Sequence, residues 1–166
     1  MAVRRPKLTI EKTLLEKFAN ILGTAGILIM VLLVALNWGS LPDIVPTHFN
    51  GAGEADGWGS KFTLLILPGI AILSHILLEI VERKPHTHNY PARLTEENAV
   101  LFYTESVRII NLTKNIIAMM FAFITYHMMR GAMNGAEQLN MVGLAIFMIL
   151  LFAVIIIGMV RMARIK

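Results

Sequence analysis

The hydrophobic residues of this chain are gathered into four long runs, which are separated by shorter polar stretches. The runs cover residues 18–36, 62–81, 109–128 and 139–160. Each has about 20 residues, the length that an α-helix needs to cross the hydrocarbon core of a bilayer. The pattern therefore predicts an all-α integral membrane protein with four transmembrane helices.

The polar stretches are too short to form a second domain. The mean hydropathy of +0.66 and the 56% of hydrophobic residues are too high for a soluble domain of 166 residues. We expect a single membrane domain over residues 1–166, with an ordered loop at 37–61 and a longer loop at 82–108.

Basic residues are distributed unevenly between the polar stretches. Twelve of the 15 Lys and Arg residues, Arg4 among them, precede the first run, lie in the 82–108 loop or follow the fourth run. Because cytoplasmic segments of membrane proteins are enriched in Lys and Arg, we expect both termini in the cytoplasm and the 37–61 loop outside. This predicts a multi-pass membrane protein whose Lys- and Arg-rich side faces the cytoplasm. The basic excess then reflects topology and contact with membrane lipids, and no nucleic-acid partner is expected.

Two helix starts are indicated by capping signals. Thr9 followed by Glu11 predicts a short interfacial helix before the first run, with a frayed basic tail as the alternative. Thr95 followed by two glutamates predicts another start, and neither proline nor glycine occurs from residue 96 to Arg130. The third run is therefore expected to be the far half of one long helix.

The 37–61 loop has the composition of a binding site. Its glycines and two prolines favour tight turns and an extended backbone. The candidate ligand-binding residues are His48, Asn50, Asp56, Trp58 and Lys61. Their polar groups can bond either to a ligand or to the loop's own backbone, so a packed, hydrogen-bonded loop cap is the alternative interpretation.

A metal site in this loop is a second alternative. His48, Asp43 and Asp56 are potential ligands. A zinc site usually has more than one His or Cys ligand, so we favour a loop without metal and expect no cofactor. The chain has no cysteine, which excludes thiolate nucleophiles, and we find no hydrolase or nucleotide-binding motif. We therefore expect no enzymatic activity.

Three ionisable residues lie within the predicted helices. His75 and Glu79 are four residues apart on one face of the second helix, and Lys114 lies near the same end of the third. At 1.5 Å per residue, Glu79 lies about 3 Å and Lys114 about 8 Å inside the hydrophobic runs. An ion pair between Glu79 and Lys114 is therefore expected, with separate snorkelling to the membrane surface as the alternative.

The polar loop closely resembles the signature of a bacterial membrane family. The matching sequence at Leu41–Lys61 is Leu-Pro-Asp-x-x-Pro-Thr-His-Phe-Asn-x-x-Gly followed by Asp-x-Trp-Gly-Ser-Lys. His88-Asn-Tyr-Pro91 and Leu94-Thr-Glu-Glu-Asn98 resemble the segment after the second helix in short stand-alone members. The family is the domain of unknown function 1648. It forms the N-terminal part of SdpI-type immunity proteins, which protect cells from a secreted toxic peptide.

The resemblance implies a multi-pass protein of the bacterial cytoplasmic (inner) membrane, and it implies this class and location more than a function. SdpI-type proteins carry a further C-terminal membrane domain, whose motif we do not find in these residues. We expect a non-enzymatic binding or protective, immunity-like protein whose outer loop contacts a peptide, a lipid or a membrane-protein partner. The alternative is a small transporter or a metal-dependent membrane enzyme that uses His48 and the nearby acids. Transport is disfavoured because few polar residues lie near the middle of the predicted helices.

Overall fold

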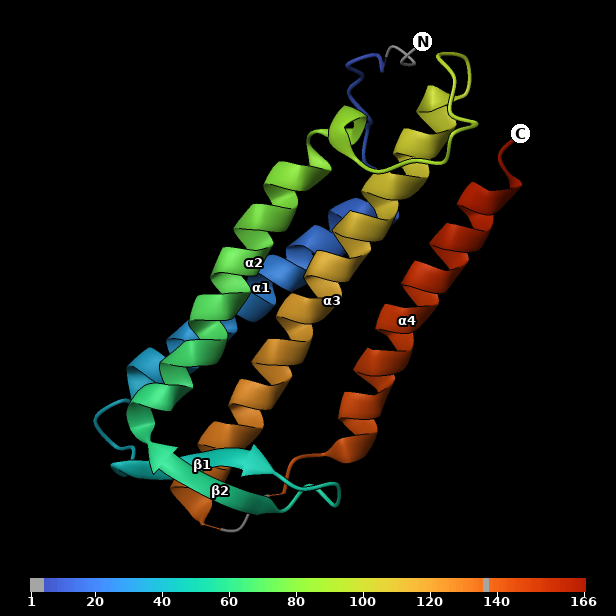
Figure 1. Ribbon diagram of the computed structural model, residues 1–166. Helices are drawn as coiled ribbons and strands as arrows, with labels where there is room; N and C mark the ends of the chain where they lie inside the picture. Colours follow the sequence, from blue (N-terminus) through green and yellow to red (C-terminus); the bar gives the residue numbers. More distant parts are fainter. Residues whose placement is uncertain (1–4, 136–137) are drawn as a thin grey trace.

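The computed structural model describes residues 5–135 and 138–166, so Arg4 lies outside the described residues. Within this part the chain forms four long helices and one β-hairpin (Figure 1). In chain order the elements are α1 (Leu14–Asn37), β1 (Ile44–Phe49), β2 (Ala55–Ser60), α2 (Ile66–Glu82), α3 (Ala99–Asn134) and α4 (Met141–Arg164). Short 3₁₀ turns at Lys61–Leu65 and Pro85–Thr87 precede and follow α2. All four helices are long and apolar enough to cross a membrane, as expected of a multi-pass membrane protein.

Helix α3 is the centre of the arrangement. It packs against α1, α2 and α4 and also against strand β1 (Figure 1). Helix α4 lies close to α3 at Gly158, where an added Cβ would be 2.3 Å from Cγ1 of Ile109. A glycine at this position therefore permits the close approach of the two helices.

Helix α1 begins later than its sequence predicts. Residues 5–13 have no regular secondary structure, so the predicted helix start at Thr9 is wrong. The helix is capped instead by Thr13, whose N–H donates to the Glu16 carboxylate at 2.7 Å, while the Thr13 hydroxyl accepts from the Glu16 N–H. The segment before the cap is not a frayed tail, because Leu8 and Ile10 pack against a buried cluster around Phe102.

Helix α3 confirms the prediction of one long helix, since it runs for 36 residues. It begins at Ala99 and not directly after Thr95, because Thr95 and Asn98 bond to each other in a turn. The Asn98 side chain accepts from the Thr95 N–H at 2.8 Å. The other three helices overlap the hydrophobic runs and differ from them by a few residues at their ends.

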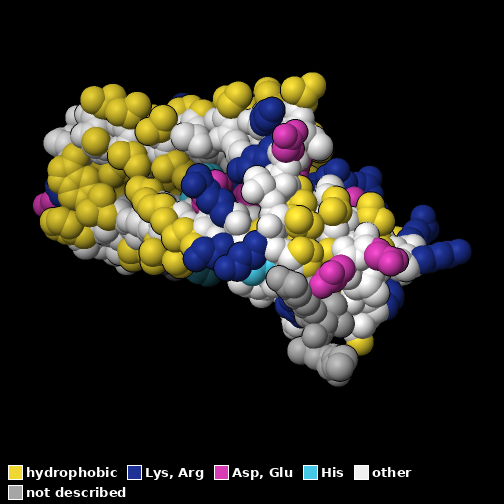
Figure 2. Space-filling view, turned by 90° about the horizontal axis from the view of Figure 1, so that it is seen from above, with side chains coloured by type: hydrophobic (Ala, Val, Ile, Leu, Met, Phe, Trp, Pro, Cys, Tyr) yellow, Lys and Arg dark blue, Asp and Glu magenta, His cyan; other side chains and the backbone are white. Residues whose placement is uncertain are grey.

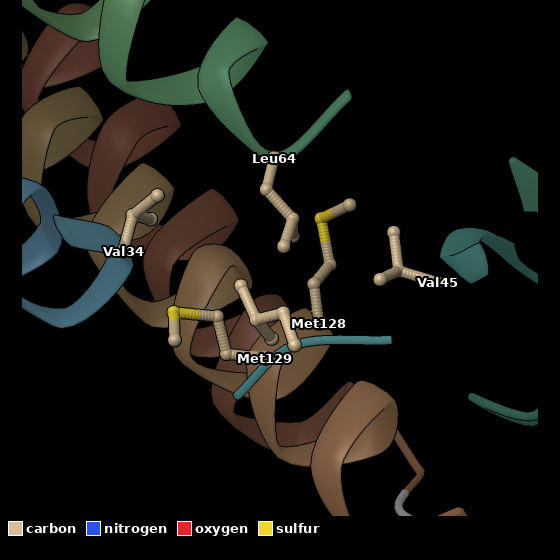
Figure 3. Close-up of a cluster of buried hydrophobic side chains, with 6 residues drawn as sticks. Val34, Val45, Leu64, Met128 and Met129 are labelled. Carbon is tan, nitrogen blue, oxygen red and sulfur yellow. The ribbon is translucent and has the colours of Figure 1, made fainter. Parts of the chain in front are cut away.

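The expectation of an all-α protein is wrong in the 37–61 loop, which folds as an antiparallel hairpin. Ile44 lies opposite Ser60, and Phe49 lies opposite Ala55. The inner side of β1 joins the protein core through Val45, which is completely buried (Figure 3). The surrounding cluster comprises Val34, Leu41, Leu64, Met128 and Met129. The hairpin is therefore attached to the ends of α1, α2 and α3.

The bundle has two chemically different ends. At one end α1 begins, α2 ends and α4 ends, close to the C-terminus; at the other end lies the hairpin (Figure 1). We call these the terminus end and the hairpin end. Seen from the terminus end, Lys and Arg side chains gather there, while the flanks of the molecule are hydrophobic (Figure 2). The assignment of the terminus end to the cytoplasm stays a prediction.

Candidate functional site

Asn50 holds the turn of the hairpin. Its Oδ1 accepts from the N–H groups of Ala52 at 2.9 Å and Glu54 at 3.0 Å, and its Nδ2 donates to the Glu54 carboxylate at 3.2 Å. Gly53 has φ +83°, a conformation that favours glycine, and its carbonyl accepts from the Leu139 N–H at 2.8 Å. Asn50 thus shapes a turn that is bonded to the connection between α3 and α4.

Lys61 closes the base of the hairpin. Its ammonium group lies 3.0 Å from the Asp43 carboxylate and 5.7 Å from the centre of the Trp38 ring. Its N–H donates to the Asp43 carbonyl at 2.9 Å. The backbone bond joins the two ends of the hairpin, and the mostly buried Lys61 side chain reaches the end of α1, whereas 92% of the Asp43 side chain is exposed.

His48, Asp56 and Trp58 project from the hairpin. Nδ1 of His48 and Oδ1 of Asp56 are 2.5 Å apart, although 72% of the His48 side chain and 44% of the Asp56 side chain are exposed. Trp58 is 54% exposed. Asp56 and Trp58 are two residues apart on β2 and therefore share its exposed face. We call these three residues the exposed triplet.

The His48–Asp56 contact orients the imidazole ring. A carboxylate can only accept, so Nδ1 of His48 carries the proton and Nε2 is left for another partner. Across the described residues, no hydroxyl group bonds to His48, so the pair lacks the nucleophile of a hydrolase triad. The pair is thus an exposed polar contact with a fixed ring orientation.

The metal-site alternative is only partly assembled. The structure brings His48 and Asp56 together, but Asp43 is bonded to Lys61 instead. In residues 5–135 and 138–166, no three His, Cys, Asp or Glu side chains gather as a potential metal site. His48 and Asp56 therefore have no third ligand among the described side chains.

Cavities lie on both sides of the hairpin. One, of about 360 Å³, is lined mainly by apolar side chains next to His48, among them Phe49, Ile66 and Met128. The other, of about 210 Å³, has Trp58 in its wall and lies between the hairpin and the end of α3. His48 therefore borders one hollow and Trp58 borders the other.

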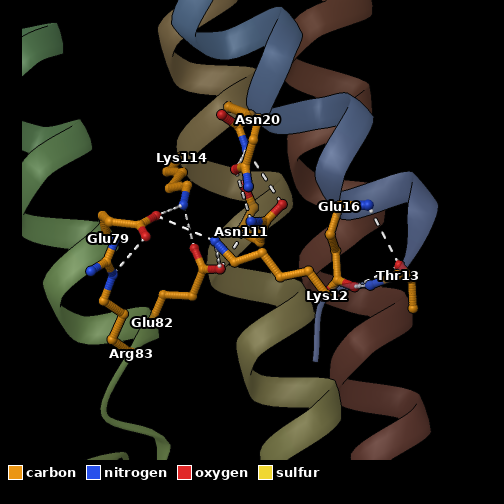
Figure 4. Close-up of polar contacts among 10 residues, drawn as sticks. Lys12, Thr13, Glu16, Asn20, Glu79, Glu82, Arg83, Asn111 and Lys114 are labelled. Atoms are coloured by element: carbon orange, nitrogen blue, oxygen red, sulfur yellow. Dashed lines mark hydrogen bonds and ion pairs between the residues drawn. The ribbon is translucent and has the colours of Figure 1, made fainter. Parts of the chain in front are cut away.

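A second polar group lies at the terminus end, inside the bundle (Figure 4). The Lys114 ammonium group contacts the carboxylates of both Glu79 and Glu82. Lys12 lies 2.7 Å from Glu82 and 3.5 Å from Glu79, and the Arg83 side chain donates to Glu79 at 2.8 Å. The structure thus has the Glu79–Lys114 contact, within a larger network that joins α2, α3 and the segment before α1.

Asparagines extend this network towards α1. The Asn111 side chain donates to Glu82 at 3.0 Å and to Asn20 at 2.9 Å. Asn115 also donates to Asn20, at 2.8 Å. His75, which is on the same helix face as Glu79, is not joined to this network by a hydrogen bond, since its buried Nδ1 has no partner in the described part of the chain. Each charge in the network has an opposite charge beside it, which is what a structural tie requires.

The second matched motif has a structural role. Nε2 of His88 donates to the Val81 carbonyl at 2.8 Å, and Nδ1 of the same ring forms a hydrogen bond with the Ser106 hydroxyl at 2.7 Å. The Tyr90 hydroxyl donates to the Pro85 carbonyl at 2.9 Å, and burial raises the pKa of Tyr90 to about 12. These contacts fasten the end of α2 to α3.

The hairpin lies within the part of the chain that matches a known domain. Residues 25–72 match the domain of unknown function DUF1648. The match confirms the expected resemblance and covers the second half of α1, the whole hairpin and the first part of α2. The DUF1648 region therefore includes the exposed triplet, whereas the buried ion network lies beyond it.

One relative is an uncharacterized protein of the archaeon Archaeoglobus fulgidus. The two chains are 28% identical over 142 residues, which cover 77% of this chain and 78% of the relative. No solved structure matches the chain. Because this relative is archaeal, the similarity does not assign the chain to a bacterial membrane.

Sequence reasoning missed several members of the buried network. Glu82 precedes Arg83 and Lys84 and reads as part of a solvated loop, yet its side chain is only 1% exposed. Lys12 reads as part of a basic tail, yet it reaches Glu82 across the fold. The available signal was the i, i+3 spacing of Glu79 and Glu82, which places both carboxylates on one face of a helix.

Proposed function

We propose that this chain is a non-enzymatic binding protein of a cell membrane that recognises an extended peptide through the exposed side chains of its hairpin. The observation that carries the proposal is the exposed triplet: a histidine and an aspartate bonded at 2.5 Å, beside an exposed tryptophan. None of the three is required to fill the core or to shape the turn.

The form of the hairpin supports a peptide as the ligand. Strand β1 packs against α3, whereas β2 is the outer strand of a two-stranded sheet. Such a strand offers backbone groups to an extended peptide, and flanking hollows accept its side chains. Strand β1 contains Pro46, which has no N–H to donate, whereas β2 contains no proline.

The immunity-like role is the specific form of this proposal. The resemblance of Leu41–Lys61 to the N-terminal domain of SdpI-type proteins supports a secreted toxic peptide as the ligand. The excess of Lys and Arg at the terminus end supports an extracytoplasmic hairpin in a cytoplasmic membrane. A peptide that arrives from outside would then meet the exposed triplet first.

The proposal is tested by titrating the full chain in lipid nanodiscs with the fluorescently labelled toxic peptide of an SdpI-type system. We expect saturable binding. Truncation of a contact residue at the centre of an interface typically costs more than about 1 kcal/mol, so His48→Ala, Asp56→Ala and Trp58→Ala should each weaken binding by about fivefold or more.

Ile44→Ala is the matched control, because Ile44 is an exposed hairpin residue outside the triplet. It should bind as the wild type does. If no saturable binding occurs, or if Ile44→Ala weakens binding as much as Trp58→Ala does, the proposed peptide-binding role is wrong.

A further inference from the structure

A separate cleft opens at the terminus end between α1, α3 and α4. Its volume is about 330 Å³, and its walls are mainly aliphatic, with Leu15 from α1, Leu112 from α3, and Val154 and Ile157 from α4. Gly158 and Ile109 form its floor where α4 touches α3. The cleft is therefore a hydrophobic slot along helices that are apolar enough to lie in a membrane.

Two arginines and one glutamate lie among the lining residues. Arg108 donates to the Glu105 carboxylate at 2.7 Å, and Arg161 lies 3.9 Å from the other oxygen of the same carboxylate. The Glu105 carboxylate is therefore the counter-charge of both the Arg108 and the Arg161 guanidinium groups. The two arginines and the glutamate together have one excess positive charge. The Arg161 side chain is 54% exposed.

We propose that this cleft binds an anionic phospholipid, with an acyl chain between α1 and α4 and the phosphate beside Arg108 and Arg161. A phosphodiester carries one negative charge and would balance the excess charge of the group. Guanidinium groups match phosphate oxygens in geometry and remain charged. Basic groups between transmembrane helices, close to the helix ends, are suited to anionic lipid headgroups.

The charges at the mouth of the cleft favour a lipid over a second copy of this chain. A second copy would bring the same Lys- and Arg-rich terminus end beside the two arginines, and like charges repel. A lipid supplies in one molecule both the apolar chain that the walls fit and the anion that the arginines require. The site is remote from the hairpin and does not depend on the peptide-binding proposal.

Native mass spectrometry of the full chain tests the proposal. The protein in detergent is mixed with equal amounts of phosphatidylglycerol and phosphatidylcholine that have identical acyl chains. We expect the wild type to retain phosphatidylglycerol in preference by about fivefold. Arg161→Gln should abolish most of this preference. Glu105→Gln should increase it, because both guanidinium groups then lack a counter-charge.

Three controls make the test decisive. Arg164→Gln changes a basic residue of the same helix end that does not line the cleft, and it should keep the wild-type preference. Val154→Trp should lower the retention of both lipids by filling the cleft, with the melting temperature in lipid-free detergent confirming that the variant is folded. Glycerol phosphate should not displace the lipid.

Three results would overturn the proposal. Equal retention of the two lipids by the wild type would show that the cleft does not select an anionic headgroup. Equal effects of Arg161→Gln and Arg164→Gln would show general charge attraction at the helix ends. Displacement by glycerol phosphate would show an anion site and no lipid site.

Discussion

The two ends of the bundle each have a pair of ionisable residues in contact, but the two pairs lie in opposite surroundings. At the hairpin end, His48 and Asp56 are bonded to each other in an exposed position. At the terminus end, Lys114 and Glu82 are bonded to each other with almost no exposure. The contacts are alike in kind, but the solvent around them differs.

This difference distinguishes residues that stabilise the fold from residues that are exposed to a binding partner. A buried charge loses its hydration and must be compensated by its neighbours, so removing one partner of a buried pair is costly. An exposed pair contributes little to stability, because water and salt screen it. The terminus network is therefore explained by the packing of α1, α2 and α3, whereas stability does not explain the exposed triplet. The exposed triplet is therefore a better candidate for binding than the buried network is.

The largest expected effect concerns the sides of the membrane on which the two ends lie. The chain has no cysteine, and both Ser40 and Thr87 are exposed. We expect Ser40→Cys, at the hairpin end, to react completely with a membrane-impermeant thiol reagent on intact cells. Thr87→Cys, at the terminus end, should react only after the membrane is permeabilised.

Permeabilised cells supply the control for this experiment, since both variants should then be labelled. Labelling of Thr87→Cys but not Ser40→Cys on intact cells would reverse the orientation. The exposed triplet would then face the cytoplasm, and the proposed binding of a peptide from outside would be wrong.

The second prediction concerns the stability of the buried network. Lys114→Met removes the buried cation that contacts both the Glu79 and Glu82 carboxylates and leaves the buried Glu82 with only the partly exposed Lys12 as a charged partner among the described residues. The variant should lower the free energy of unfolding by about 3–5 kcal/mol. The melting temperature in detergent measures this loss. The double variant Lys114→Met/Glu82→Gln should recover part of it, because the uncompensated buried charge is then removed.

Arg83→Gln is the matched control. Arg83 bonds to Glu79 at 2.8 Å, but 74% of its side chain is exposed. Its loss should therefore cost less than about 1 kcal/mol. If Lys114→Met costs no more than Arg83→Gln, or if the losses in the double variant are additive, the contrast between buried and exposed pairs does not hold.

The helices were predictable because their signal is local and strong. A run of about 20 apolar residues defines a transmembrane helix whatever its neighbours are. The depth of a residue in the membrane is also fixed by its position along the helix. The contact between Glu79 and Lys114 was therefore predictable from their similar distances to the same end of the hydrophobic runs. The absence of proline and glycine likewise predicted the length of α3.

The hairpin was not predictable from local preference. Pro46 and the glycines of β2 are unfavourable in strands. Distant contacts stabilise it instead, since Val45 is buried with Met128 and the Gly53 carbonyl accepts from the Leu139 N–H. In the sequence the five candidate residues therefore look like one group. Only the fold shows that Asn50 and Lys61 shape the hairpin, whereas the exposed triplet does not.

The smallest expected effect separates the two kinds of residue within the hairpin. Asn50→Ala removes two side-chain acceptor bonds to the N–H groups of Ala52 and Glu54 and should accelerate their hydrogen exchange by about tenfold. His48→Ala and Asp56→Ala remove only an exposed contact, so exchange at the same amides should change by less than about threefold. Equal acceleration in all three variants would make the His48–Asp56 pair a structural contact. The two ends of the bundle would then differ in exposure alone, and the case for binding at the hairpin would lose its main support.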